Sequence, residues 1–120
     1  MPIKVRSAKN KGVRLQNWIK ERIHHHFPMI QYDHVKCAIM GEGGEDIRLT
    51  EEARAILPVK IEAKNTEKVS VWAAYDQATS HIELATPLLI IKKNRRKPLA
   101  VIDADYMFKL LRNQHEVFKK

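Results

Sequence analysis

The segment Val59–Lys64 constrains the fold more than any other part of this 120-residue chain. Its apolar and polar residues alternate, and the side chains of a strand point to opposite faces at successive positions. Glu62 and Lys64 therefore share one face, while Ile61 and Ala63 share the other. We expect a strand that is buried on one side and carries a carboxylate and an ammonium group on the other.

The first part of the chain predicts a basic arm followed by a helix. Residues 1–10 are polar and basic without an apolar period, and we expect a flexible arm there. From Lys11 onward apolar residues recur at helical spacing, and Pro28 ends the helix because proline disfavours helical geometry in the residue before it. The expected buried stripe comprises Leu15, Trp18, Ile19 and Ile23.

The rest of the chain predicts strands that alternate with helices. The expected elements are strands at 30–40 and 46–49, a short helix at 50–57 capped by Thr50, a strand at 59–64, a helix after Ser70, strands at 86–92 and 99–102, and a helix after Asp103. The side chains expected to face inward from the last two helices are Trp72, Tyr75, Thr79 and Ile82, and then Met107, Leu110 and Leu111. This order predicts an α/β fold with a mixed central β-sheet flanked by helices, and residues 11–120 are long enough for one domain.

The charge of the chain favours a polyanionic partner. There are 22 Lys and Arg against 14 Asp and Glu, which gives a net charge of +8. Such a charge favours nucleic acid first, through neutralisation of phosphates and release of counterions. The cations expected to contact a DNA backbone form two clusters, Lys9, Lys11 and Arg14, and then Lys93, Arg95, Arg96 and Lys97. Neither cluster is interleaved with aromatic residues, so a stacking platform for single strands is not expected.

Cysteine content and hydropathy indicate a cytoplasmic protein without a membrane partner. The single cysteine, Cys37, cannot form an internal disulfide, which fits a reducing compartment. The longest apolar run, about 87–91, is far shorter than the roughly 18 residues of a membrane span. The basic N-terminus has no apolar segment behind it, so we do not expect a signal peptide.

Glu62 and Lys64 also define a candidate catalytic site together with Asp46. Asp46 lies sixteen positions before Glu62, after the glycine-rich segment 41–44. Two carboxylates can hold Mg²⁺ through their oxygens. A neighbouring lysine can orient or deprotonate a water molecule and offset charge on a phosphate. The alternative interpretation is a surface salt bridge on an exposed strand face.

Four segments, taken together, resemble the PD-(D/E)XK nuclease superfamily, and within it the small phage-borne and archaeal-type Holliday junction resolvases. The segments are 11–16 for the first-helix motif, 44–47 for the Pro-Asp motif, 61–64 for the Glu-x-Lys motif and 74–78 for the glutamine-containing helix. The resemblance extends from about Lys9 to Leu111. Glu45 stands where the family has its proline, and Gln16 stands where the family has an acid or amide.

The resemblance implies a restriction-endonuclease-like fold and assigns roles to individual residues. It implies that Asp46, Glu62 and the backbone carbonyl of Ala63 bind Mg²⁺, with Mn²⁺ as an alternative. It implies that Lys64 activates or positions the attacking water and that Gln77 orients the site. Gln16 would position a water or a phosphate.

The implied function is a Mg²⁺-dependent, structure-specific DNA endonuclease. The expected substrate is branched DNA, most of all a four-way junction, and the expected enzyme is a homodimer that acts in the host cytoplasm if the gene belongs to a phage. The first alternative is another repair or nicking nuclease of the same superfamily. The second alternative is a non-catalytic nucleic-acid-binding protein that keeps the fold.

Overall fold

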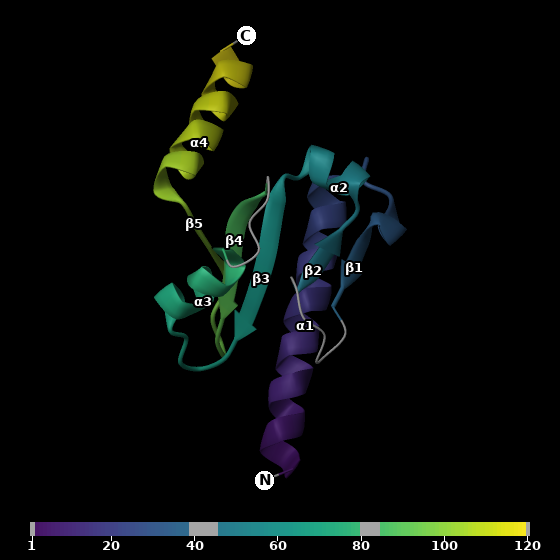
Figure 1. Cartoon of the computed structure of the whole chain (residues 1–120), viewed down its shortest axis with the longest axis vertical. Helices are drawn as coiled ribbons and strands as arrows, with labels where there is room; N and C mark the ends of the chain where they lie inside the picture. Colours follow the sequence, from purple (N-terminus) through teal and green to yellow (C-terminus); the bar gives the residue numbers. More distant parts are fainter. Residues whose placement is uncertain (1, 39–45, 80–84, 120) are drawn as a thin grey trace.

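In the part of the chain that the structure describes, five strands form one mixed sheet at the centre of the molecule (Figure 1). The computed structural model describes residues 2–38, 46–79 and 85–119. Its elements are α1 (Pro2–His26), the 3₁₀ turn η1 (Tyr32–His34), β1 (Val35–Cys37), β2 (Ile47–Leu49), α2 (Glu51–Ile56), β3 (Val59–Asn65), α3 (Val71–Thr79), β4 (Thr86–Lys92), β5 (Leu99–Ile102) and α4 (Ala104–Lys119). The prediction of an α/β fold with a mixed sheet and flanking helices is therefore confirmed.

The strands follow one another across the sheet in their order along the chain. β1, β2 and β3 are antiparallel neighbours, and β5 is antiparallel to β4. β3 and β4 are parallel, from the pair Val59 and Thr86 to the pair Asn65 and Lys92. A parallel pair needs a crossover connection, and α3 supplies it. The long pair β3 and β4 therefore forms the centre of the sheet.

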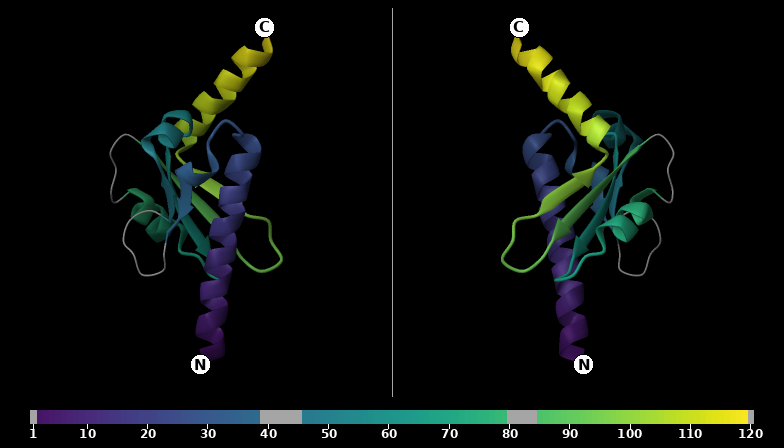
Figure 2. Two further views of the ribbon diagram at one scale, coloured as in Figure 1. Left: turned by 90° about the vertical axis from the view of Figure 1, so that its right-hand side faces the viewer. Right: turned by 90° about the vertical axis from the view of Figure 1, so that its left-hand side faces the viewer.

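α1 covers one face of the sheet, and the main hydrophobic core lies between them (Figure 2). Its residues Leu15, Ile19 and Ile23 are buried against a cluster that includes Ile47 and Ile61. Trp18 was expected in the same stripe, but 41% of it is exposed. At about 100° per residue, positions 15, 19 and 23 turn progressively one way around the helix, whereas position 18 lies on the other flank.

α1 also begins earlier than expected, at Pro2 instead of Lys11. The segment predicted as a flexible arm is therefore helical from its second residue. Two physical reasons support this. Proline is well suited to the first helical position, and Lys4, Arg6, Ala8 and Lys9 are good helix formers.

The predicted strand at 30–40 begins later in the structure. Among its described residues, Tyr32–His34 forms η1 and Val35–Cys37 pairs with β2, while residues 39 and 40 lie outside the described part of the chain. The glycine-rich segment 41–44 and Glu45 lie outside the described residues. The predicted short helix is confirmed as α2, where the hydroxyl of Thr50 accepts a hydrogen bond from the backbone N–H of Ala53 at 3.2 Å.

α3 packs on the sheet face opposite to α1 (Figure 2), but with a different side from the one expected. Ala74 and Ala78 are buried, whereas Trp72 is 82% exposed. Small side chains let a helix approach a sheet closely, so the alanines face inward and the larger tryptophan faces solvent. Ile82 lies outside the described residues.

α4 projects beyond the end of the sheet (Figure 1). The predicted start is confirmed, because the carboxylate of Asp103 accepts a hydrogen bond from the backbone N–H of Tyr106 at 2.9 Å. The side chains expected to face inward are instead exposed, by 36% for Met107, 42% for Leu110 and 49% for Leu111. Helical spacing indicates an apolar side but does not show what it packs against.

Among the helices in the described ranges, none combines the length and the apolar content that crossing a bilayer requires.

Candidate active site

Asp46 is fixed beside β3 by its own backbone and side chain. Its side-chain oxygen Oδ2 accepts a hydrogen bond from the backbone N–H of Ala63 at 2.7 Å. Its backbone N–H donates to the carbonyl of Ile61 at 3.2 Å, where β2 pairs with β3. A residue sixteen positions upstream in the sequence is therefore placed directly alongside the Glu-x-Lys segment.

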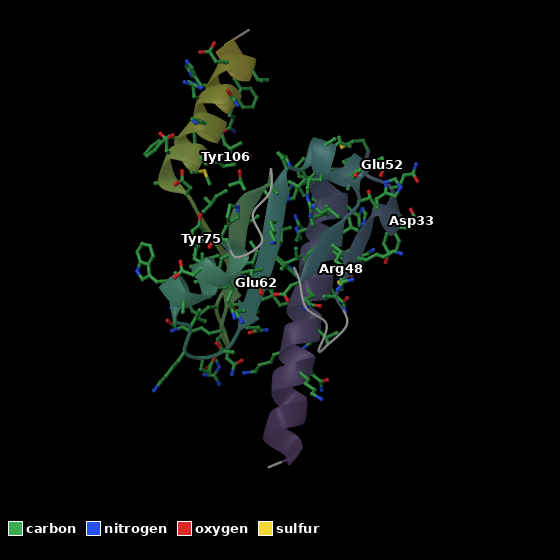
Figure 3. The ribbon with its side chains drawn as sticks, in the orientation of Figure 1. Asp33, Arg48, Glu52, Glu62, Tyr75 and Tyr106 are labelled. Carbon is green, nitrogen blue, oxygen red and sulfur yellow. The ribbon has the colours of Figure 1, made fainter. Side chains whose placement is uncertain are left out.

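Glu62 lies on the α3 side of β3, as the strand alternation predicts. Ile61 is buried with the α1 core on the other face, so Glu62 points away from that core. In the view of Figure 3, Glu62 lies between Tyr75 of α3 and Arg48 of β2. Lys60 and Lys64 flank it on the same face of the strand.

Burial and the neighbouring carboxylate of Asp46 raise the pKa of Glu62 to about 7. Loss of water around the carboxylate is the largest cause, followed by the negative charge of Asp46. Protonated Glu62 also donates a hydrogen bond to Asp46, while the positive charges of Lys64 and Lys60 act in the opposite direction. Asp46 and Glu62 therefore form an interacting pair of carboxyl groups, as expected of a cation site.

Lys64 and Gln77 line one hollow on the α3 side of β3. The hollow has a volume of about 230 Å³ and lies between the end of β3 and α3. Its other lining residues are Thr66, Lys68, Val69, Ser70, Ala73 and Ala74. The structure thus brings together two side chains that the sequence assigned to the same site, from the central strand and from the crossover helix.

The backbone of Ala63 faces the same edge of β3 as Asp46. The N–H and C=O groups of one strand residue point toward the same neighbouring strand. Because the N–H of Ala63 donates to Asp46, its carbonyl oxygen also lies on the β2 side. This carbonyl is the third oxygen that the sequence assigned to a metal.

Gln16 lies apart from these groups. It is half-buried on α1, which covers the opposite face of the sheet. Its catalytic role stays a prediction.

The donor set of the site fits a hard divalent cation. Two carboxylates and a backbone carbonyl are oxygen ligands, which Mg²⁺ prefers, and water completes its shell in most protein sites. Within residues 2–38, 46–79 and 85–119, no three His, Cys, Asp or Glu side chains gather as a metal-binding group. A site at this position is therefore limited to the two acids, Asp46 and Glu62, with the carbonyl of Ala63.

The predicted DNA-binding cations gather around the turn between β4 and β5. Lys93, Arg96 and Lys97 line a groove of about 480 Å³ on the α3 side. Lys11, Arg14 and Arg95 line a second groove, of about 320 Å³, between α1 and the same turn. The N-terminal and hairpin clusters, about 80 residues apart in the sequence, therefore meet in the second groove. Lys9 is exposed on α1 and lines neither groove.

Two further residues of the second groove were not predicted. Trp18 was assigned to the core but lines the groove, and Asn65 lies at the end of β3. The side-chain amide of Asn65 donates to the carbonyl of Lys11 at 2.9 Å and ties α1 to β3. The spacing of Lys11, Arg14, Leu15 and Trp18 places all four on one side of a helix, and this signal could have identified Trp18.

Comparisons with known proteins gave no match to the chain. No protein-family model matches the chain, and neither a curated protein nor a solved structure shows significant similarity to it.

Without a metal, the protein is expected to lose stability as the pH rises from 4.5 to about 7. In this interval folded Glu62 keeps its proton while unfolded Glu62 has released it, so the folded state binds more protons. The free energy of unfolding then falls with increasing pH. Thermal midpoints in EDTA across this range measure the effect.

The control for this measurement is Glu62→Gln, which cannot ionise. We expect its profile to be flatter than that of the wild type. Parallel profiles of the two proteins would contradict the raised pKa of Glu62.

Proposed function

We propose that this protein is a Mg²⁺-dependent DNA endonuclease with a restriction-endonuclease-like fold, and that its substrate is a four-way junction. The observation that carries the proposal is the pairing of Asp46 with Glu62 beside Lys64. Two carboxyl groups in such proximity raise the free energy of the folded protein when both are ionised, and a divalent cation between them removes that cost. The catalytic interpretation explains why the pair is present.

The arrangement of the central strands supports the fold assignment. The candidate residues come from β3, from the residue before β2 and from the crossover helix α3. The family that the sequence resembles distributes its Pro-Asp, Glu-x-Lys and glutamine motifs over equivalent elements. The long parallel pair β3 and β4 is the rigid support for the site.

Each residue of the candidate site has a defined part in the proposed reaction. Asp46, Glu62 and the Ala63 carbonyl would hold Mg²⁺, which supplies positive charge at the phosphate and lowers the pKa of bound water. Lys64 orients the attacking water and offsets charge that develops on the phosphate. Gln77 lines the same hollow as Lys64 and orients groups there.

The basic grooves support DNA as the substrate. Both grooves lie at the end of β3 where Lys64, Asn65 and Thr66 follow one another. Cations on both sides of the β4–β5 turn can neutralise phosphates on either side of the site. Recognition through phosphates and shape suits a substrate defined by its branching instead of its sequence.

The exposed side of α4 supports a homodimer. Its exposed large apolar side chains are Met107, Phe108, Leu110, Leu111, Val117 and Phe118. The charged residues Asp105, Lys109, Arg112 and Glu116 share the opposite side, where Lys109 and Asp105 form an ion pair of 3.5 Å. An apolar side of this extent on a soluble helix needs a covering partner.

A second copy of α4 is the partner that the charges favour. The segment 103–120 carries four Lys and Arg and three Asp and Glu, so it contributes only +1 to the net charge of +8. Two copies of a basic chain therefore repel each other only weakly along this helix. In an antiparallel pair, the two copies of α4 are related by a two-fold axis. Such two-fold symmetry gives a junction two active sites.

Asp46→Asn tests the proposed activity most simply. We expect cleavage of a labelled four-way junction in Mg²⁺ to fall at least roughly 100-fold, because a cation ligand is lost, while junction binding is retained. Asp33→Asn, an exposed acid outside the site, is the control and should cleave like the wild type. Wild-type binding without cleavage in any divalent metal would move the protein to the class of non-catalytic binders.

Leu111→Asp tests the dimer. A charge in the centre of the apolar side should convert a dimer into a monomer, as measured by sedimentation equilibrium. Lys109→Ala changes the charged side of the same helix and should leave the dimer intact. A monomeric wild type, free and on DNA, would contradict the dimer and favour a nicking nuclease.

A further inference from the structure

The groove between α1 and the β4–β5 turn combines cations with an exposed aromatic ring. Its lining comprises Lys11, Arg14, Leu15 and Trp18 of α1, Asn65 and Lys92 from the ends of β3 and β4, and Asn94, Arg95 and Pro98 of the turn. Four of these residues are Lys or Arg, and none is an acid. The groove therefore presents positive charge that carboxylates of its own lining do not offset.

The cations of the groove are held on a fixed frame. The hydrogen bond from Asn65 to the carbonyl of Lys11 joins α1 to the end of β3. The turn is set by Arg95, whose φ of 65° lies in the left-handed region, and by Glu67, whose carboxylate accepts the backbone N–H of Asn94 at 2.7 Å. A fixed frame lowers the entropy cost of binding an anionic ligand.

Trp18 gives the groove a second chemical character. The core stripe of α1 runs through Leu15, Ile19 and Ile23, and Trp18 lies on its flank with 41% of its surface exposed. Pro98 of the turn lines the groove with it and adds apolar surface. A ring next to Lys and Arg matches a ligand that has both a flat apolar face and a negative charge.

We propose that this groove binds an unpaired nucleotide of the DNA substrate, with the base stacked on Trp18 and the flanking phosphates on Lys11, Arg14 and Arg95. Base-paired DNA offers the phosphates but keeps its bases inside the stack, so it does not supply a base to Trp18. The ligand class is single-stranded DNA, or the unpaired nucleotides at a branch point. The inference rests on the proposed role in DNA processing and adds a selectivity for unpaired segments to it.

The position of the groove relative to the carboxylate pair supports this role. Lys64 belongs to the site on the α3 side, and the next residue, Asn65, belongs to the groove on the α1 side. Successive strand residues point to opposite faces, so the end of β3 separates the site on the α3 side from the groove on the α1 side. A DNA strand that passes over the end of β3 can contact both the site and the groove.

Fluorescence of Trp18 tests the proposal without any need for cleavage. The chain has two tryptophans, so Trp72→Phe leaves Trp18 as the only one. In EDTA, a thymidine oligonucleotide should quench the fluorescence of this variant to saturation, and a duplex of equal length should leave it nearly unchanged. The matched variant Trp18→Phe keeps only Trp72, which is 82% exposed and outside the groove, and its fluorescence should not respond.

Affinity measurements give an independent readout. Trp18→Ala should weaken binding of the oligonucleotide by about 10-fold or more, and Trp18→Phe should restore most of it, because stacking requires only an aromatic face. Binding of duplex DNA should change little in either variant. Absence of quenching by the oligonucleotide, or an equal loss for duplex and single strand, would overturn the proposal.

These outcomes are separate from those that test the nuclease activity. If Trp18 is quenched but no DNA is cleaved in Mg²⁺, the groove stands and the catalytic proposal fails. If DNA is cleaved but Trp18 does not respond, the groove fails and the catalytic proposal stands.

Discussion

The hydrogen bond from the backbone of Ala63 to the carboxylate of Asp46 is the interaction on which the candidate site depends. Its length is 2.7 Å, and it fixes a residue from outside the central strand beside Glu62. The neighbouring pairing of Ile47 with Ile61 holds the two strands in the required register. Both isoleucines are fully or almost fully buried under α1, so the core on one face determines the geometry of the polar groups on the other.

The cost of this geometry is electrostatic. Burial and the nearby negative charge of Asp46 raise the pKa of Glu62 to about 7, so Glu62 titrates near neutral pH. A protein selected only for stability gains nothing from such a pair, whereas a site that binds a divalent cation requires it. Lys60 and Lys64 reduce the repulsion from the same face of β3 but do not cancel it.

The sequence predicted what depends on local periodicity and missed what depends on tertiary contacts. The alternation in Val59–Lys64 was sufficient to place Glu62 and Lys64 on one face and Ile61 in the core. Helical spacing was not sufficient to show which flank of α1 or α3 packs against the sheet, so Trp18 and Trp72 were wrongly assigned to buried sides. Large aromatic residues suggest burial in a pattern, but in α3 the small Ala74 and Ala78 fill the contact.

The same difference between local patterns and tertiary contacts applies to the candidate site. Residue chemistry associated Asp46 with Glu62 and Lys64, and the resemblance then assigned the metal-binding and catalytic roles, but no local pattern could show that positions sixteen residues apart lie side by side. The two basic clusters were each visible in the sequence, but their meeting beside Trp18 depends on the β4–β5 turn folding back toward α1. α4 has a clear apolar side, and no periodicity could show that this side faces away from its own chain.

The most direct test of the central claim is a calorimetric titration of the protein with Mg²⁺ in buffers of different ionisation enthalpy, at a pH just below 7. Cation binding between Asp46 and Glu62 must displace the proton that Glu62 carries, so heat that varies with the buffer is expected and should disappear in Glu62→Gln. Binding of Mg²⁺ without release of a proton, or no binding at all, would contradict a metal site at this carboxylate pair.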